Sequence, residues 1–307
     1  MLKKSSFRRI AMATLILLLI LLVYFFPVKY TYKENISYIT SPKIPIYLID
    51  KNNYTARTSI AKNTENQDEL IKLLINSLTI GSIESSYIPI DFKAIIPENT
   101  KLLNYTIENK ILTLNFNKNF LNIAKENENK LLEVLVYTLI EFKNIEKITI
   151  LIENNPLTKF KSGTTIPKYL DKTIGINKVA NITSLKNTQA TTVYYICKNK
   201  DLSYFVPITK INNTNNNKVE IIIKELQTTP LYETNLISYL ATSSNLTNYE
   251  LLDNSISLSF DNYLLANLNN KEILEEVKYS IALSLRDTYN INKVIFNIQD
   301  TKDIISI

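Results

Sequence analysis

The sequence predicts an α+β protein made of two tandem repeats, each a small mixed β-sheet covered on one face by two helices, after an N-terminal transmembrane helix. Three observations support this prediction. An uncharged apolar run lies near the N-terminus, three sequence patches recur in the same order, and apolar residues within each repeat follow helical and then alternating spacing. We expect a stub and anchor at residues 1–30, a first module at 40–178 and a second, diverged module at 188–307.

The composition excludes several kinds of chemistry. The 307 residues include no histidine, one cysteine and three isolated glycines. Histidine-dependent catalytic triads and tetrahedral zinc sites therefore lack their residues, and a glycine-rich phosphate loop cannot form. The net charge of +6 shows no clustered basic tract, so no nucleic-acid partner is expected. The sequence predicts a protein that is not an enzyme and has no cofactor. Residues with AT-rich codons are abundant, which indicates a bacterial source.

The apolar run extends from Ile10 to Phe26 and is long enough to be a short membrane-spanning helix. Four basic residues precede it and only two follow closely, so the N-terminus is expected in the cytoplasm and the rest outside. A cleaved signal peptide is the alternative, but the residues after Phe26 are bulky rather than small. The sequence therefore favours a single-pass protein of the bacterial cell membrane with extracytoplasmic C-terminal domains.

An internal repeat accounts for most of the remaining chain. The paired patches are residues 46–49 with 193–196, 112–116 with 256–260, and 145–152 with 291–298, at offsets of 147, 144 and 146. Three patches in one order at nearly one spacing indicate two copies of one module.

Within the first module, residues 44–49 are expected to form a strand and residues 54–60 a second extended run. Asn66, with an acidic residue three positions later, is typical of a helix start, and leucines at helical spacing continue to Leu78. The remaining predicted elements are a hairpin over residues 102–116, a helix over residues 131–142 and a closing strand over residues 148–152.

The second module is expected to follow the same order. Residues 219–226 are rich in strand formers, but their apolar residues have helical spacing, so we predict a helix there. A later helix is predicted to open near Asn269 and to continue through Leu285. The polar segment from Asn177 to Gln189 is predicted to be a linker.

Two stretches of the first module, with the alternating strand between them, resemble the tandem GerMN-domain family of sporulation and spore germination proteins. Residues 96–103 match an "IP-x-x-T-x-L-L" pattern, and residues 137–142 match "Y-T-L-x-E-F". In the second module the latter pattern becomes Leu283-Ser284-Leu285. The family-motif residues, which we expect to have structural roles, are Pro97, Leu114, Tyr137, Thr138, Leu139 and Phe142. The hydroxyl of Thr138 is expected to bond a preceding helix carbonyl.

The resemblance implies a fold similar to that of ring-building motifs and a part in endospore formation. It implies a membrane-anchored structural component of an envelope-spanning assembly of the mother cell–forespore channel type, which contacts other protein subunits in the intermembrane space. The 19 tyrosines leave an alternative open, because they could stack on sugars. That alternative is an extracytoplasmic module that binds cell-wall or peptide ligands.

Overall fold

The computed structural model describes most of the chain after residue 42. The described residues are 43–62, 66–142, 144–184, 186–199, 202–228, 234–266, 272–299, 301–307 and five residues between positions 12 and 18. The predicted anchor Ile10–Phe26 lies outside them except for those five residues, which are helical. Among the described residues, no helix is long and apolar enough to cross a membrane. Ser41–Ile307 forms one compact unit, separate from Met1–Thr40.

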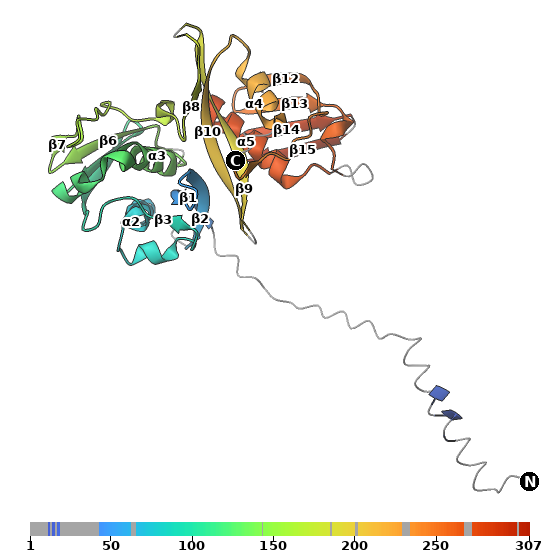
Figure 1. The fold of residues 1–307 in the computed structure, drawn as a ribbon, viewed down its shortest axis with the longest axis horizontal. Helices are drawn as coiled ribbons and strands as arrows, with labels where there is room; N and C mark the ends of the chain where they lie inside the picture. Colours follow the sequence, from blue (N-terminus) through green and yellow to red (C-terminus); the bar gives the residue numbers. More distant parts are fainter. Residues whose placement is uncertain are drawn as a thin grey trace, which may run out of the picture. The chain divides into compact units, whose positions relative to one another are not determined.

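The elements of both modules follow one order, from blue to green and from yellow to red in Figure 1. Those of the first module are β1 (Lys43–Asp50), β2 (Thr55–Ala61), α2 (Gln67–Leu78), β3 (Phe92–Lys93), β4 (Leu102–Glu108), β5 (Ile111–Phe116), α3 (Glu128–Leu139), β6 (Lys147–Ile152) and β7 (Asn155–Pro156). Those that follow are β8 (Val179–Asn181), β9 (Thr188–Asn199), β10 (Leu202–Asn213), α4 (Lys218–Gln227), β11 (Leu236–Ile237), β12 (Leu246–Leu252), β13 (Ser255–Phe260), α5 (Glu275–Tyr289), β14 (Lys293–Ile298) and β15 (Thr301–Ser306).

The observed helix starts can be compared with those predicted from asparagine and the acidic residues that follow it. Asn66 and Asn217 precede α2 and α4, and each side-chain oxygen accepts a hydrogen bond from the backbone N–H two residues later. This bond satisfies one of the donors that a helix start leaves free. The predicted helices α2 and α4 are thus confirmed. The predicted start of α5 near Asn269 is wrong, because α5 begins at Glu275 and the described residues 272–274 before it are not helical.

The prediction of a single sheet per module, covered on one face by two helices, is wrong. In the described part of each module, β5 pairs antiparallel with β4 and parallel with β6, and β13 does the same with β12 and β14. The hairpins β1–β2 and β9–β10 belong to a different sheet. Alternating apolar residues indicate which side of a strand is buried, but they do not indicate which strands become neighbours.

The register of the strands confirms the tandem repeat. The inward-facing pairs are Leu112 with Ile148, Leu114 with Ile150 and Phe116 with Ile152 in the first module, and Ile256 with Val294, Leu258 with Phe296 and Phe260 with Ile298 in the second. These side chains are all buried. A register irregularity occurs between Leu102 and Asn104 and again between Leu246 and Asn248, at an offset of 144.

The two modules share one sheet. Within the described residues this sheet has seven strands in the order β11-β9-β10-β2-β1-β3, with β8 paired to β10. In the repeat, β1, β2 and β3 correspond to β9, β10 and β11. Equivalent strands therefore lie at equal distances from the two ends of this order, with β2 and β10 at its centre. The modules are therefore related by an approximate two-fold axis between β2 and β10, which pair antiparallel at Arg57 and Phe205.

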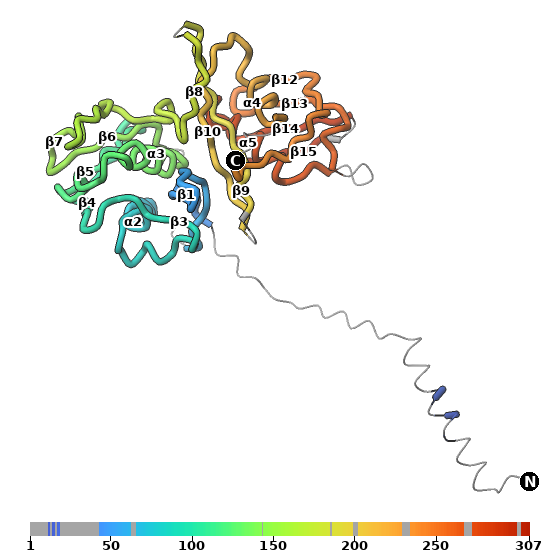
Figure 2. The backbone as a smooth tube through the Cα atoms, in the orientation of Figure 1, coloured from blue at the N-terminus to red at the C-terminus, as the bar shows by residue number. Residues whose placement is uncertain are grey.

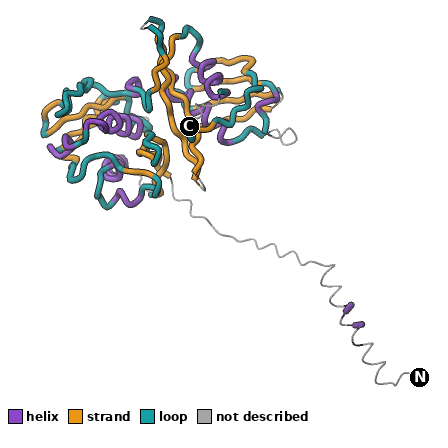
Figure 3. The backbone as a smooth tube through the Cα atoms, in the orientation of Figure 1, coloured by secondary structure: helices purple, strands orange, loops and turns teal. Residues whose placement is uncertain are grey.

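Helices and strands pack around this shared sheet. In Figure 2 the long β9–β10 hairpin lies between the first module and the rest of the second, and Figure 3 shows α3 on one side of it and α5 on the other. Helix α3 packs against β1, and the equivalent helix α5 packs against β9. One continuous cluster of buried apolar residues extends through both modules. The chain from residue 43 onward thus has a junction between modules rather than a loose linker.

The segment predicted to be a linker takes part in this junction. Asn177 accepts a hydrogen bond from Thr55 N–H at 2.9 Å and donates to the carbonyls of Thr55 at 2.7 Å and Pro207 at 2.8 Å. Thr55 on β2 and Pro207 on β10 lie on the two strands that meet at the axis. One asparagine side chain therefore ties the two central strands together.

Candidate functional site at the junction between the modules

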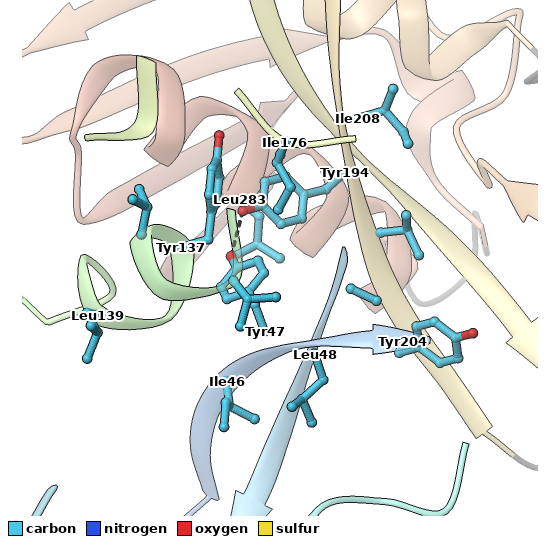
Figure 4. Close-up of a cluster of buried hydrophobic side chains, with 14 of the residues drawn as sticks. Ile46, Tyr47, Leu48, Tyr137, Leu139, Ile176, Tyr194, Tyr204, Ile208 and Leu283 are labelled. Carbon is cyan, nitrogen blue, oxygen red and sulfur yellow. Dashed lines mark hydrogen bonds between the residues drawn. The ribbon is translucent and has the colours of Figure 1, made fainter. Parts of the chain in front are cut away.

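Two buried tyrosines meet at the approximate two-fold axis. Tyr47 on β1 and Tyr194 on β9 occupy equivalent positions and are fully buried, and their hydroxyl oxygens are 2.7 Å apart. Figure 4 shows the two side chains pointing toward one another. The backbone N–H of Tyr47 donates to Thr138 Oγ1 at 3.0 Å, and that of Tyr194 donates to Ser284 Oγ at 2.9 Å. The same contact between strand and helix is therefore made once in each module, by threonine in one and serine in the other.

Each tyrosine also donates to an acidic residue at the end of its own module's helix. The hydroxyl of Tyr47 donates to Glu141 Oε1 at 2.9 Å, and the hydroxyl of Tyr194 donates to Asp287 Oδ2. Glu141 and Asp287 are equivalent at an offset of 146. With both acids ionised, two hydroxyl protons serve three oxygen–oxygen contacts, so one contact lacks a hydrogen at any moment.

Three cations surround the two carboxylates. The guanidinium of Arg286 binds Glu141 through two bonds, of 2.6 Å and 2.9 Å, and also lies 3.1 Å from Asp287. Arg57 Nε is 3.1 Å from Glu141 Oε1, and Lys172 Nζ is 2.5 Å from Asp287 Oδ1. Two-bond arginine–carboxylate pairs are strong and directional. Arg286 of the second module and Glu141 of the first thus form a direct ionic link between the modules.

Burial and charge together determine how these groups titrate. Burial alone would raise the pKa of Glu141, but Arg286 and Arg57 outweigh it and lower that pKa to about 2. Burial opposes ionisation of Asp287 as well, and Lys172 and Arg286 nevertheless hold its pKa below the ordinary value. Both carboxylates are therefore ionised near neutral pH.

The tyrosines titrate in the opposite direction. Burial raises the pKa of Tyr47 and of Tyr194 well above the ordinary value, and the neighbouring carboxylates raise each further. The hydroxyls therefore stay protonated at neutral pH. A general acid or base needs a pKa near the working pH, and neither the two tyrosines nor the two carboxylates of the junction meet that condition. The arrangement is suited to fixing two modules together.

The acids outside the junction do not add a metal site. Glu133 on α3 is buried, which raises its pKa, and it accepts a hydrogen bond from Thr55 Oγ1 at 2.9 Å. Glu128 at the start of α3 is buried and accepts from Ser162 Oγ at 2.6 Å. In the part of the chain that the structure describes, no group of three or more His, Cys, Asp or Glu side chains could hold a metal ion.

A cleft of about 1100 Å³ opens beside the network. Its lining includes Arg57, Glu141, Lys172 and Arg286 of the network, together with Ile307 at the C-terminus. Charges of both signs line it, and the network carboxylates already have cationic partners. The cleft is large enough for a peptide or glycan fragment.

The predicted motif residues lie in the core around this junction. Thr138 and Leu139 are fully buried on α3, and Tyr137 packs edge-on against Tyr47 with ring centroids 5.5 Å apart. The carbonyl of Lys172 accepts a hydrogen bond from the Tyr137 hydroxyl at 3.3 Å. The prediction that Thr138 bonds a preceding helix carbonyl is wrong, because its hydroxyl faces the backbone of β1. The equivalent Ser284 does make such a bond, to the carbonyl of Ser280 at 2.6 Å.

The other predicted motif residues lie away from the charged network. Pro97 is buried after β3, Leu114 is buried in β5, and Phe142 is half-buried against the apolar core. They support the fold of the first module.

Sequence reasoning did not single out the charged residues of the network. One signal was present, because Glu141 is the acidic position of the "Y-T-L-x-E-F" pattern and Asp287 recurs three residues after Ser284. Arg286 corresponds to Ile140 at the same offset of 146, so the repeat could not identify it.

This chain is similar in sequence and in structure to known sporulation and spore germination proteins. The family model described as "Germane: Sporulation and spore germination" matches residues 45–158. The spore germination protein GerM of Bacillus subtilis (strain 168) is 27% identical over 267 residues, which covers 85% of this chain and 72% of that protein. The solved structure of the tandem GerMN domains of the sporulation protein GerM from Bacillus subtilis superposes with a TM-score of 0.76 at 27% identity, covering 85% of this chain and 92% of that one.

Proposed function

This chain belongs to the tandem GerMN-domain family of sporulation and spore germination proteins, and from this membership we propose that it is a structural component of an envelope-spanning assembly. It acts there through contacts with other protein subunits and has no catalytic centre. The assembly is of the kind that joins mother cell and forespore, and the two modules lie in the space between the membranes. The uncharged run Ile10–Phe26 anchors the chain, with the N-terminus in the cytoplasm.

The observation that supports this proposal best is the buried charge network at the junction, in which both carboxylates are paired. Glu141 and Asp287 each have cationic partners, and both are ionised near neutral pH. A buried network of this kind has little capacity for acid–base chemistry and a strong effect on relative orientation. A fixed orientation is useful to a subunit that must present two modules to neighbours at once, because tethered weak contacts add through effective concentration.

The cleft beside the network supports a second candidate, an extracytoplasmic module that binds a cell-wall or peptide ligand. Its volume of about 1100 Å³ and its mixed charges suit a polar ligand. This candidate predicts loss of ligand binding from changes in the cleft alone. The assembly proposal predicts that function depends on both modules.

A genetic exchange tests the proposal. Replacing the segment Ile10–Phe26 with an unrelated membrane anchor should preserve sporulation and germination, because only location and the modules matter. Exchanging both modules for unrelated folded domains should abolish sporulation or germination and leave vegetative growth normal. If the module-exchanged strain sporulates and germinates normally, or loses only vegetative wall growth, the assembly role is refuted.

A further inference from the structure

The loop between α2 and β3 exposes a cluster of large apolar side chains. We call residues 80–90 the isoleucine loop. Its exposed members are Ile80 at 47%, Ile83 at 83%, Tyr87 at 40% and Ile90 at 102% of full exposure. Isoleucine is among the residue types most often buried in folded proteins. A cluster of this kind within eleven consecutive residues is typical of a contact surface.

The polar groups of the isoleucine loop are largely satisfied within the chain. Three serine hydroxyls donate to nearby carbonyls, Ser82 to Asn76 at 2.5 Å, Ser85 to Ser82 at 2.6 Å and Ser86 to Ile83 at 2.7 Å. The 3₁₀ turn η1 (Glu84–Tyr87) adds backbone bonds, including Ser86 N–H to the Ile83 carbonyl at 3.1 Å. Burying an unsatisfied polar group in an apolar medium is costly. A loop whose polar groups are already bonded can enter such a medium at a lower cost.

The isoleucine loop lies beside the point where the chain enters the folded unit. The ring of Tyr87 is 4.8 Å from Lys62 Nζ, and Lys62 directly follows Ala61, the register partner of Lys43 at the start of β1. Sixteen residues separate Lys43 from Phe26, the end of the apolar run. A fully extended chain of that length spans at most about 60 Å. The covalent chain thus keeps the start of β1 within that distance of the anchor's end.

We propose that the isoleucine loop inserts into the surface of the lipid bilayer that holds the chain's own anchor. The inference rests on the anchoring part of the proposed function. Ile83 and Ile90 would enter the boundary between headgroups and acyl chains, and Tyr87 with Lys62 would lie at the headgroup level, as tyrosine and lysine often do at membrane interfaces.

Charge does not drive this contact. Glu84 and Asp91 lie within or next to the isoleucine loop, and the nearby cations are Lys62 and Lys93. With both signs present, the attraction to an anionic bilayer is weak, and burial of apolar side chains supplies the contact. Bilayer contact at the loop should therefore persist at high salt.

A single introduced tryptophan tests the proposal, because the natural chain contains none. The full chain with Ile83→Trp is reconstituted into vesicles of phosphatidylethanolamine and phosphatidylglycerol, with or without bromine on the acyl chains. Brominated lipid should reduce its tryptophan emission about twofold or more, since bromine quenches only nearby rings. The control is Ile304→Trp on β15, which is 50% exposed and should lose little emission. Ile90→Trp repeats the measurement at the other end of the loop.

The outcomes separate the loop from the anchor. If the chain floats with vesicles but neither Ile83→Trp nor Ile90→Trp is quenched, loop insertion is overturned while anchoring stands. If either tryptophan is shielded from water without quenching by bromine, a protein partner covers the loop and the bilayer proposal fails. A chain that does not float with vesicles overturns both the anchor and the insertion.

Discussion

Replacing Glu141 with glutamine tests the ionic link between the modules most directly. The side chain of Glu141 is 4% exposed, and its partners Arg286 and Arg57 are 12% and 24% exposed. Removing one partner from a buried ion pair costs about 3–5 kcal/mol, because the remaining charge stays buried without compensation. The partial exposure of the two arginines places the expected loss near the lower value, about 3 kcal/mol.

The pH dependence of stability gives a second value for the same interaction. The pKa of Glu141 is about 2 in the folded chain and 4.5 is its ordinary value, and this difference corresponds to about 3 kcal/mol. Because the folded pKa is depressed, the contribution is complete above about pH 5 and is lost as the pH falls toward 2. The difference between natural chain and Glu141→Gln should therefore shrink to about 1 kcal/mol at pH 3.

Urea unfolding of residues 43–307, followed by far-ultraviolet circular dichroism, measures both values. The matched control is Glu146→Gln, because Glu146 pairs with Lys110 at 2.6 Å but both side chains are at least half exposed. The control should change the unfolding free energy by at most about 0.5 kcal/mol. A loss below about 1 kcal/mol for Glu141→Gln at pH 7, or the same loss at pH 3 as at pH 7, would refute the reasoning.

Other substitutions test the remaining contacts. Thr138→Val and Ser284→Ala each leave a buried tyrosine N–H without its partner, so each should lower the unfolding free energy by about 1–3 kcal/mol in the same urea assay, and unchanged midpoints would contradict the paired contact. Leu135→Ala on α3 should cost about 2–5 kcal/mol, and Leu135→Asp should cost more because it buries a charge, so an unchanged melting temperature for the latter would remove α3 from the core. Protease added to intact protoplasts should remove the chain from about Lys29 onward, and full protection would contradict the predicted topology.

The sequence predicted local structure well where the deciding forces are local. Asn66 was identified as a helix start because its side chain can bond a neighbouring N–H, and the structure contains that bond. The apolar alternation of residues 112–116 identified a buried strand face, and the same face is buried in β13. These inferences depend on neighbours in sequence, which the sequence shows directly.

The pairing of distant strands could not be predicted in the same way. Nothing in residues 55–61 indicates that β2 should pair with β10, about 150 positions later, rather than with a strand of its own module. That contact is held by residues distant from one another in sequence. Tyr47 bonds to Tyr194, and Asn177 bonds to the carbonyl of Pro207. The charged site was missed for the same reason. Arg286 and Lys172 each form an ion pair across the junction, with a residue of the other module.

The symmetry of the junction limits how further subunits can bind. Equivalent elements meet there, β2 with β10 and Tyr47 with Tyr194, so the contact is isologous. An isologous contact is closed and uses the same surface from both partners, which leaves neither surface free for another chain. Subunits of the proposed assembly must therefore bind elsewhere. Within the described residues, β3 and β11 end the shared sheet. The two four-stranded sheets end at β4 and β7 and at β12 and β15. These strands are equivalent in pairs, so each chain presents every such edge twice, once in each module. A partner that binds the edge of one module therefore finds an equivalent edge of diverged sequence in the other module.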